Sequence, residues 1–71
     1  MNRIPVSSSN LTSVGYDPAT QTLEVEFLHD GVYQYLGVPL AIYDTWMADD
    51  FRDTYFDRYV KQAGYSYQKI C

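Results

Sequence analysis

The sequence is poor in cysteine and histidine and has no long apolar run, and each scarcity excludes a class of protein. The one cysteine, Cys71, has no partner for an internal disulfide, and with His29 as the one histidine it cannot build a metal cluster. We therefore expect neither a metal nor another cofactor. An unpaired thiol is typical of a reducing compartment, so the sequence predicts a cytoplasmic protein. The first residues carry no apolar signal core, and no stretch approaches the length of a membrane span.

Positive charge is also scarce. Five lysines and arginines stand against nine aspartates and glutamates, which gives a formal net charge of −4. Proteins that hold nucleic acid chiefly through its phosphates are expected to be basic, and so are proteins that bind anionic membranes. The charge balance therefore argues against both as the main source of affinity. The charge balance still permits a local basic face that could bind nucleic acid.

Aromatic side chains are abundant, with eight tyrosines and an aromatic fraction of 17%. Large rings bury much surface per residue, which helps a chain of 71 residues that is near the lower size limit for a core without disulfides. The length fits one small domain over residues 1–71. The pattern predicts an α+β fold, with a three-stranded antiparallel meander over residues 10–36 and two short helices over 39–63 covering one face.

The hairpin at residues 23–36 is the clearest local signal. Apolar and acidic residues alternate over 23–27, as in a strand with one buried face. A three-residue loop at 29–31 puts Tyr33 and Tyr35 on that buried face, whereas a two-residue loop puts them on the solvated face. We predict the three-residue loop, with Phe27 paired to Tyr33, because it gives one continuous apolar face.

The flanking segments follow from their turn and helix signals. Either a bulge or a late start of the strand is expected between Leu11 and Val14, where the apolar phase shifts, and a turn is expected at 17–21. Residues 1–9 form a polar lead-in, in which Pro5 permits only a short edge strand. The tail, residues 65–71, alternates again and is expected to form a short extra strand or an extended strap.

Both helices carry an apolar stripe. The first begins after Pro39, and its stripe is Ile42, Tyr43, Trp46 and Met47. The second is expected to begin at Asp50 as its N-cap and to end at Gly64. Its predicted stripe consists of Phe56, Tyr59, Val60 and Ala63.

Several short motifs follow one another in the order found in a known family. They are Val6-Ser7-Ser8-Ser9-Asn10, Val14-Gly15-Tyr16-Asp17, Leu23-Glu24-Val25-Glu26-Phe27, Val32-Tyr33-Gln34-Tyr35, Gly37-Val38-Pro39 and Tyr55-Phe56. The order resembles the KTSC domain, which also occurs at the C-terminus of some lysyl-tRNA synthetases and as small stand-alone proteins of bacteria and phages. The resemblance implies association with RNA. The connection at 49–54 is longer and more acidic than in the relatives.

Two kinds of binding site are open to such a chain. Single-stranded RNA is held by aromatic rings on which bases stack, beside a few cations. The candidates for this role are Tyr33, Tyr35, Arg58, Lys61, Tyr65, Tyr67 and Lys69. A basic protein partner would instead meet an acidic stripe and an exposed aromatic residue. The candidates for that role are Asp49, Asp50, Asp53, Asp57 and Trp46.

Catalysis has little support in the sequence. His29 is expected to be a solvated residue at the hairpin tip, and no order of Ser, His and Asp or of Cys and His favours a nucleophile. The prediction is therefore a non-enzymatic binding module. Its partner is either RNA or a protein, the latter consistent with an inhibitory or accessory protein, including a phage-encoded one that acts on a host protein. The oligomeric state does not follow from the sequence.

Overall fold

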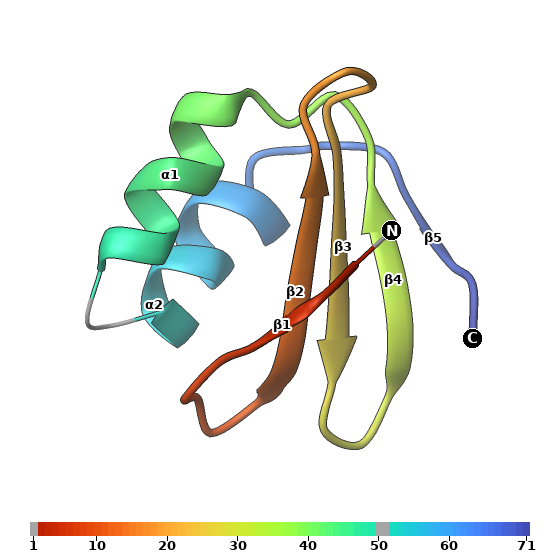
Figure 1. Cartoon of the computed structure of the whole chain (residues 1–71), viewed down its shortest axis with the longest axis vertical. Helices are drawn as coiled ribbons and strands as arrows, with labels where there is room; N and C mark the ends of the chain where they lie inside the picture. The colour runs from red at the N-terminus through yellow and green to blue at the C-terminus, as the bar shows by residue number, and fades with distance from the viewer. Residues whose placement is uncertain (1, 50–51) are drawn as a thin grey trace.

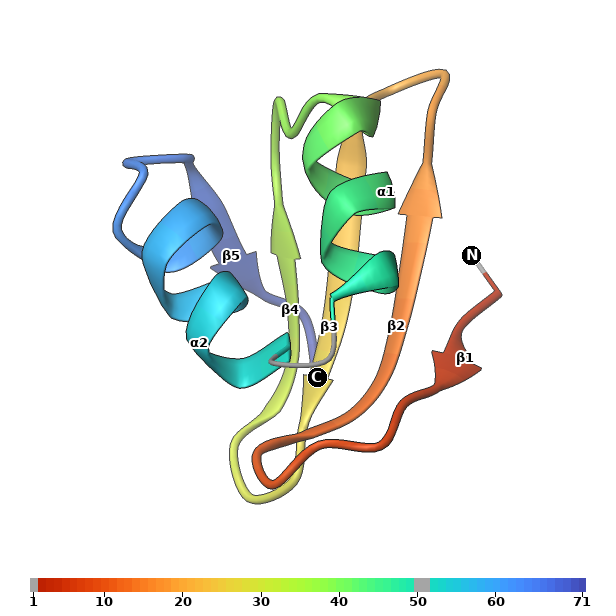
Figure 2. The same cartoon turned by 90° about the vertical axis from the view of Figure 1, so that its left-hand side faces the viewer.

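The computed structural model describes residues 2–49 and 52–71, and it shows a five-stranded antiparallel sheet with its helices packed on one face (Figures 1 and 2). The strands lie side by side in chain order. The elements are β1 (Ile4–Pro5), β2 (Leu11–Asp17), β3 (Thr22–Phe27), β4 (Gly31–Tyr35), α1 (Leu40–Ala48), α2 (Arg52–Phe56), the π-helical turn η1 (Asp57–Lys61) and β5 (Tyr67–Lys69).

The predicted α+β class is confirmed, but the sheet is larger than the predicted three strands. β1 pairs with β2 at one edge, and β5 pairs with β4 at the other. Both edge strands are very short, two and three residues long. The extra strand expected in the tail and the short edge strand allowed at Pro5 are both present, but which strand each one joins is set by tertiary contacts.

The first two long strands follow the sequence pattern. The register of β2 against β3 shifts between Leu11 and Ser13, which confirms the predicted bulge. The turn between them is also confirmed, because the Ala19 N–H donates to the Asp17 carboxylate at 3.0 Å. Val14 and Val25 are paired in this ladder, and both are fully buried.

The predicted pairing of the β3–β4 hairpin is wrong by two residues. Phe27 pairs with Gly31 and Val25 pairs with Tyr33, so the three-residue loop consists of residues 28–30. Gly31, with φ of +84°, therefore opens β4 instead of closing the loop. A shift of two residues keeps every side chain on the same face, so Tyr33 still lies on the face of Val25 and Phe27 as predicted.

The helices cover the apolar face of the sheet, as expected. Trp46 of α1 and Val60 of η1 are fully buried, and so is Val38, which leads into α1. The Phe56 ring lies against Trp46, with 5.3 Å between the ring centroids. The buried core as a whole consists of Leu11, Val14, Leu23, Val25, Tyr35, Val38, Trp46, Tyr55, Phe56 and Val60.

The second helical segment departs from its predicted stripe. Phe56 and Val60 are buried, but Tyr59 is 45% exposed and Ala63 is exposed as well. The reason is the π-helical turn, whose wider i→i+5 spacing rotates the later side chains away from the α-helical phase. Tyr59 lies instead against the outer side of the buried Tyr55, with the rings tilted and 4.5 Å between their centroids.

Gly31 offers a test of how the C-terminal segment is docked. Gly31 and Gly37 both have positive φ, so alanine should cost about 1–2 kcal/mol at either position. A Cβ at Gly31 would in addition lie 2.3 Å from the Cys71 carbonyl oxygen, whereas a Cβ at Gly37 meets open space. We expect Gly31→Ala to reduce the free energy of unfolding by about 1–3 kcal/mol more than Gly37→Ala does. Urea denaturation measures both, and equal losses would show that the chain end does not lie against Gly31.

Candidate functional site

A groove lined by aromatic rings opens where β3, β4 and β5 meet the end of η1. We call it the aromatic groove. Its volume is about 460 Å³, and it is lined by Phe27, Asp30, Tyr33, Tyr35, Lys61 and Tyr67. All three residues of β5 are exposed, so the helices leave this end of the sheet accessible.

The rings of the aromatic groove support one another. Phe27 meets the Tyr33 ring edge-on, with 5.4 Å between centroids. The Tyr67 ring lies 6.1 Å from Tyr33 and 5.3 Å from Tyr35. Tyr67 is 63% exposed, whereas Tyr35 is 4% exposed. The groove therefore has a rigid floor and one ring that presents its surface to solvent.

Asp30 organises the polar rim of the aromatic groove. The Tyr33 hydroxyl donates to Asp30 at 3.0 Å, and this hydrogen bond is the main reason why the pKa of Tyr33 is raised above 10.0. The Lys69 ammonium lies 3.8 Å from the other Asp30 oxygen and 6.0 Å from the centroid of the Tyr33 ring. Lys69 is thus held over the groove, although its charge is shared with an exposed carboxylate.

A second, smaller cavity adjoins the aromatic groove. Its volume is about 300 Å³, and it shares Phe27, Asp30 and Lys61 with the groove. Asp53 and Asp57 lie on its helical side. Lys61 is therefore the cation between an aromatic region and an acidic one.

The structure separates the four candidate tyrosines. Tyr67 is the exposed member, and Tyr33 is half-buried beside it in the aromatic groove. Tyr35 is part of the core, so it supports the groove from below and does not offer a free ring face. Tyr65 is partly buried and packs against the core outside the groove.

The candidate cations are separated as well. Lys61 and Lys69 lie at the aromatic groove. Arg58 instead lines another cavity, of about 470 Å³, with Tyr55 and Tyr59. Sequence reasoning missed Asp30 as the organiser of the groove, although its place beside the hairpin glycine was a usable signal.

The structure places the described candidates for the protein contact in different settings. Trp46 is fully buried, so its prediction as a surface contact is wrong. Asp53 is half-buried and engaged by the segment before β2, while Asp57 is exposed and accepts a hydrogen bond from Gln62 at 2.8 Å. Asp49 is half-buried at the end of α1. Asp50, predicted as an N-cap and a contact, lies outside the described residues.

Asp53 holds the segment before β2 against the second helix. Both Ser8 and Ser9 donate hydroxyl hydrogen bonds to its carboxylate, the latter at 2.6 Å. The Ser9 N–H donates as well, at 3.3 Å. These bonds, that of Ser8 first, hold the pKa of Asp53 below 3.8. The carboxylate predicted to meet a partner is thus used within the fold.

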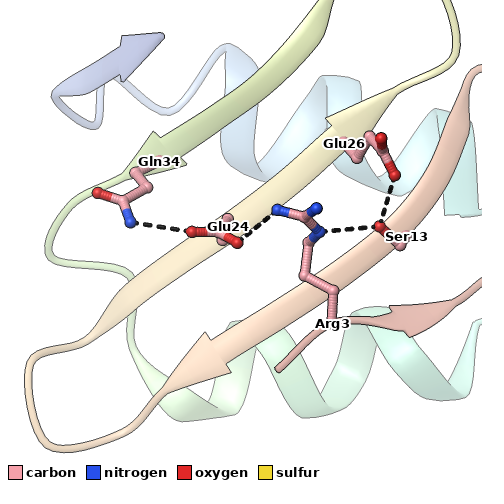
Figure 3. A network of polar contacts seen from close by, with 5 residues as sticks. All are labelled: Arg3, Ser13, Glu24, Glu26 and Gln34. Carbon is pink, nitrogen blue, oxygen red and sulfur yellow. Dashed lines mark hydrogen bonds and ion pairs between the residues drawn. The ribbon is translucent and has the colours of Figure 1, made fainter. Parts of the chain in front are cut away.

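The opposite face of the sheet carries a polar network (Figure 3). Arg3 donates to the Glu24 carboxylate at 2.6 Å and to the Ser13 hydroxyl at 3.1 Å. Gln34 donates to the other Glu24 oxygen at 3.0 Å, and Ser13 donates to Glu26 at 2.9 Å. Burial by itself raises the pKa of Glu24, but the hydrogen bonds from Gln34 and Arg3 outweigh it and lower the pKa below 4.5. Glu24 is therefore a buried carboxylate in its charged form.

Two further findings concern residues 2–49 and 52–71. Within these ranges, no group of three or more His, Cys, Asp or Glu side chains is placed to hold a metal ion. None of the helices described there has the length and apolar character needed to cross a membrane. The Cys71 thiol is exposed.

Comparison with known proteins finds relatives along the whole chain. The model of the KTSC domain family matches residues 7–65. An uncharacterized protein of Stutzerimonas stutzeri (strain A1501) is 37% identical over 70 residues, which is 99% of each chain. A protein of Tsukamurella paurometabola is 35% identical over 57 residues, covering 80% of this chain and 85% of its own. The crystal structure of a KTSC domain protein from Yersinia pestis has a TM-score of 0.94 and 40% identity, and covers 99% of this chain and 97% of that one.

The contacts of Asp53 predict a pH-dependent contribution to stability. Because the folded-state pKa is lowered, the stabilisation is fully present above the unfolded-state value of about 4 and is lost as the pH falls through the folded-state pKa. We expect Asp53→Asn to reduce the free energy of unfolding by about 1–2 kcal/mol at pH 7, and the difference from wild type to shrink below about pH 4. Urea denaturation at pH 7 and pH 3 measures it.

Asp57→Asn is the matched control, because Asp57 is exposed on the same helical segment. It should change the free energy of unfolding by less than about 0.5 kcal/mol at either pH. A loss for Asp53→Asn that is the same at both pH values would contradict the assignment.

Proposed function

The chain belongs to the KTSC domain family, as the order of its motifs predicted, and we propose that it is a non-enzymatic binding module that holds single-stranded RNA in the aromatic groove. The observation that carries the proposal is the exposed Tyr67 ring beside the half-buried Tyr33, with Lys61 and Lys69 at the same groove. This is the combination of ring faces and cations by which proteins hold unpaired bases.

Base stacking supplies most of the affinity in this proposal. Tyr67 offers the accessible ring face, and Tyr33 and Tyr35 fix its position from one side. Stacking of one base on such a ring is worth about 1–3 kcal/mol. Because every base has a flat face, the groove favours unpaired strands over duplexes and discriminates little between sequences.

Electrostatic attraction to the phosphates supplies a smaller part of the affinity for RNA in this proposal. The chain carries a net charge of −4, and Lys69 is already close to Asp30. Lys61 and Lys69 are the cations at the groove, so one or two phosphates would be neutralised. For single strands the logarithm of the binding constant changes by about −0.7 per phosphate for each decade of salt, so the expected slope is only about −1.

The absence of a catalytic role is part of the proposal. His29 lies in the β3–β4 loop, and the backbone of Cys71 is hydrogen-bonded to Val32 at the start of β4, with its thiol exposed. A nucleophile needs a base within hydrogen-bond reach. Among the described residues that line the groove, the side-chain hydrogen bond runs from Tyr33 to Asp30, and neither is a strong nucleophile. The groove is thus suited to binding and not to turnover.

The alternative proposal is an acidic protein-binding or inhibitory accessory protein that acts on a host protein. The net charge of −4 favours it, because an acidic surface attracts basic partners and speeds their association. Among the described candidates, the exposed Asp57 is the carboxylate best placed for such a contact. The cytoplasmic location expected from the free thiol is compatible with either proposal.

Substitution of Tyr67 tests the RNA proposal directly. Tyr67→Ala removes the exposed ring. It should weaken the binding of a labelled single-stranded RNA of about ten nucleotides by about 5- to 100-fold, since one stacking platform is lost. Tyr59→Ala is the matched control, because Tyr59 is 45% exposed but lies in the cavity of Arg58, away from the groove. Fluorescence anisotropy at 50 and 200 mM salt measures both variants.

A second pair of variants tests the electrostatic contribution to RNA binding. Lys61→Gln should weaken RNA binding and flatten the salt dependence, whereas Arg58→Gln should leave both nearly unchanged. If wild type fails to bind RNA at 50 mM salt, or if the two tyrosine variants bind alike, the RNA proposal is refuted and the search turns to a basic protein partner.

A further inference from the structure

The smaller cavity beside the aromatic groove is built from three parts of the fold. Figure 2 shows the β3–β4 loop and the start of β2 at the same end of the sheet. Both line the cavity, together with residues of α2 and η1, and its volume of about 300 Å³ is at the lower end of the range for ligand pockets. Its apolar lining consists of Leu11, Phe27, Leu28 and Phe56. Such a pocket suits one small, flat group.

Hydrogen bonds within the chain fix the walls of the cavity. The Leu28 N–H donates to the Asn10 carbonyl oxygen at 2.8 Å, which holds the β3–β4 loop against the start of β2. The Asp53 carboxylate accepts hydrogen bonds from the hydroxyls of Ser8 and Ser9, the latter at 2.6 Å, which holds α2 against the same segment. A ligand therefore meets a site that is already shaped, and this lowers the entropic cost of binding.

The charges around the cavity disfavour an anion as its ligand. Three carboxylates line it, those of Asp30, Asp53 and Asp57, beside the single ammonium of Lys61. A phosphate placed among these groups would meet more repulsion than attraction. An uncharged, flat group with hydrogen-bond donors on its edge fits the lining better. A nucleobase is such a group, and proteins read unpaired bases by enclosing the ring and hydrogen-bonding its edge.

The cavity and the aromatic groove are adjacent, so one strand can occupy both. Phe27, Asp30 and Lys61 line the two sites together. When one base stacks on Tyr67, the next base along the strand is within reach of the cavity, and the phosphate between them lies near Lys61. Within residues 2–49 and 52–71, no side-chain hydrogen bond or ion pair engages Lys61, so its ammonium is available to that phosphate.

Asp57 is the carboxylate that is available to read the edge of a base. Asp53 is engaged by two serine hydroxyls, and Asp30 is engaged by a tyrosine hydroxyl and a lysine. Asp57 is exposed, and Gln62 donates to its Oδ2 atom at 2.8 Å. This hydrogen bond orients the carboxylate and leaves Oδ1 to accept from a ligand.

Guanine is the base that matches this acceptor. Its Watson–Crick edge carries the N1–H and the 2-amino group side by side, and one carboxylate can accept from both. Adenine and cytosine offer one amino group on that edge, and uracil offers one N–H between two carbonyl oxygens. A carboxylate repels those neighbouring acceptors. The acceptor-rich rim of the cavity therefore selects guanine over the other three bases.

We propose that the cavity beside the aromatic groove binds one guanine base, which Asp57 recognises, while the neighbouring base of the same strand stacks on Tyr67. The inference rests on the proposed RNA-binding function and adds to it a sequence preference, which the aromatic groove by itself does not supply. The ligand is thus an unpaired strand with a guanine beside a base of any kind.

Fluorescence anisotropy with four labelled strands tests the preference. Each is an oligouridine of about ten nucleotides, either unchanged or with one central guanosine, inosine or adenosine. Wild type should bind the guanosine strand about 5- to 100-fold more tightly than the adenosine strand, because one bidentate contact is gained. Both bases are purines, so their stacking largely cancels in this comparison. The inosine strand should bind with intermediate affinity, since inosine lacks the 2-amino group.

Asp57→Asn and Asp44→Asn are the matched variants. Each removes one negative charge, and both residues are exposed, but Asp44 lies on α1, outside the lining of the cavity. Asp57→Asn should abolish the preference for guanosine, because an amide offers one acceptor and places a donor beside it. Asp44→Asn should keep the preference. The two variants should bind the plain oligouridine alike.

The outcomes separate the guanine site from RNA binding as such. Equal binding of the guanosine and adenosine strands by wild type would overturn the guanine site and leave stacking in the aromatic groove intact. A preference that Asp57→Asn retains would overturn it as well. If no strand binds, the RNA proposal fails, and millimolar guanosine then tests the cavity alone. It should shift the backbone amide resonances of Leu28 and His29 where adenosine does not, and equal or absent shifts would overturn the guanine site too.

Discussion

The packing of Phe56 is the contact on which the rest of the structure depends. Its ring lies 5.3 Å from Trp46, 5.5 Å from Tyr35 and 5.6 Å from Phe27, so one side chain joins α1, β4 and β3. A chain of 71 residues has few residues with which to cover a sheet, and large rings compensate by burying more surface each. The apolar face of β2–β4 is closed by this cluster.

Because so few residues are available to cover the sheet, part of its apolar face stays uncovered. The helical cover ends at Lys61, and the exposed strand β5 extends the sheet beside it. The rings of Tyr33 and Tyr67 lie at this border with 6.1 Å between their centroids, the first half-buried and the second 63% exposed. The aromatic groove is therefore a consequence of how little helix is available, and the buried Tyr35 of the core packs beneath it.

Two of the carboxylates, those of Glu24 and Asp53, stabilise the fold through contacts within the chain. Glu24 pairs with Arg3 on the outer face, and Asp53 holds the serines that lead into β2. Each has a lowered pKa because hydrogen bonds favour its charged form. Both contacts tie the N-terminal segment to a distant part of the chain. A net charge of −4 thus overstates the acidity available to a partner.

Short-range patterns in the sequence determined the α+β class, the bulge after Leu11, the turn at 17–21 and the helix start after Pro39. Period-two alternation also placed Tyr33 and Tyr35 on the inner face, because parity survives a shift of two residues. These features depend on neighbours a few residues apart. Only the tertiary structure decided the hairpin register, the phase of η1, which of the two roles predicted for Trp46 holds, and the exposure of Tyr67. Those depend on which distant residues pack together, as do the contacts of Arg3 with Glu24 across 21 residues and of Ser9 with Asp53 across 44.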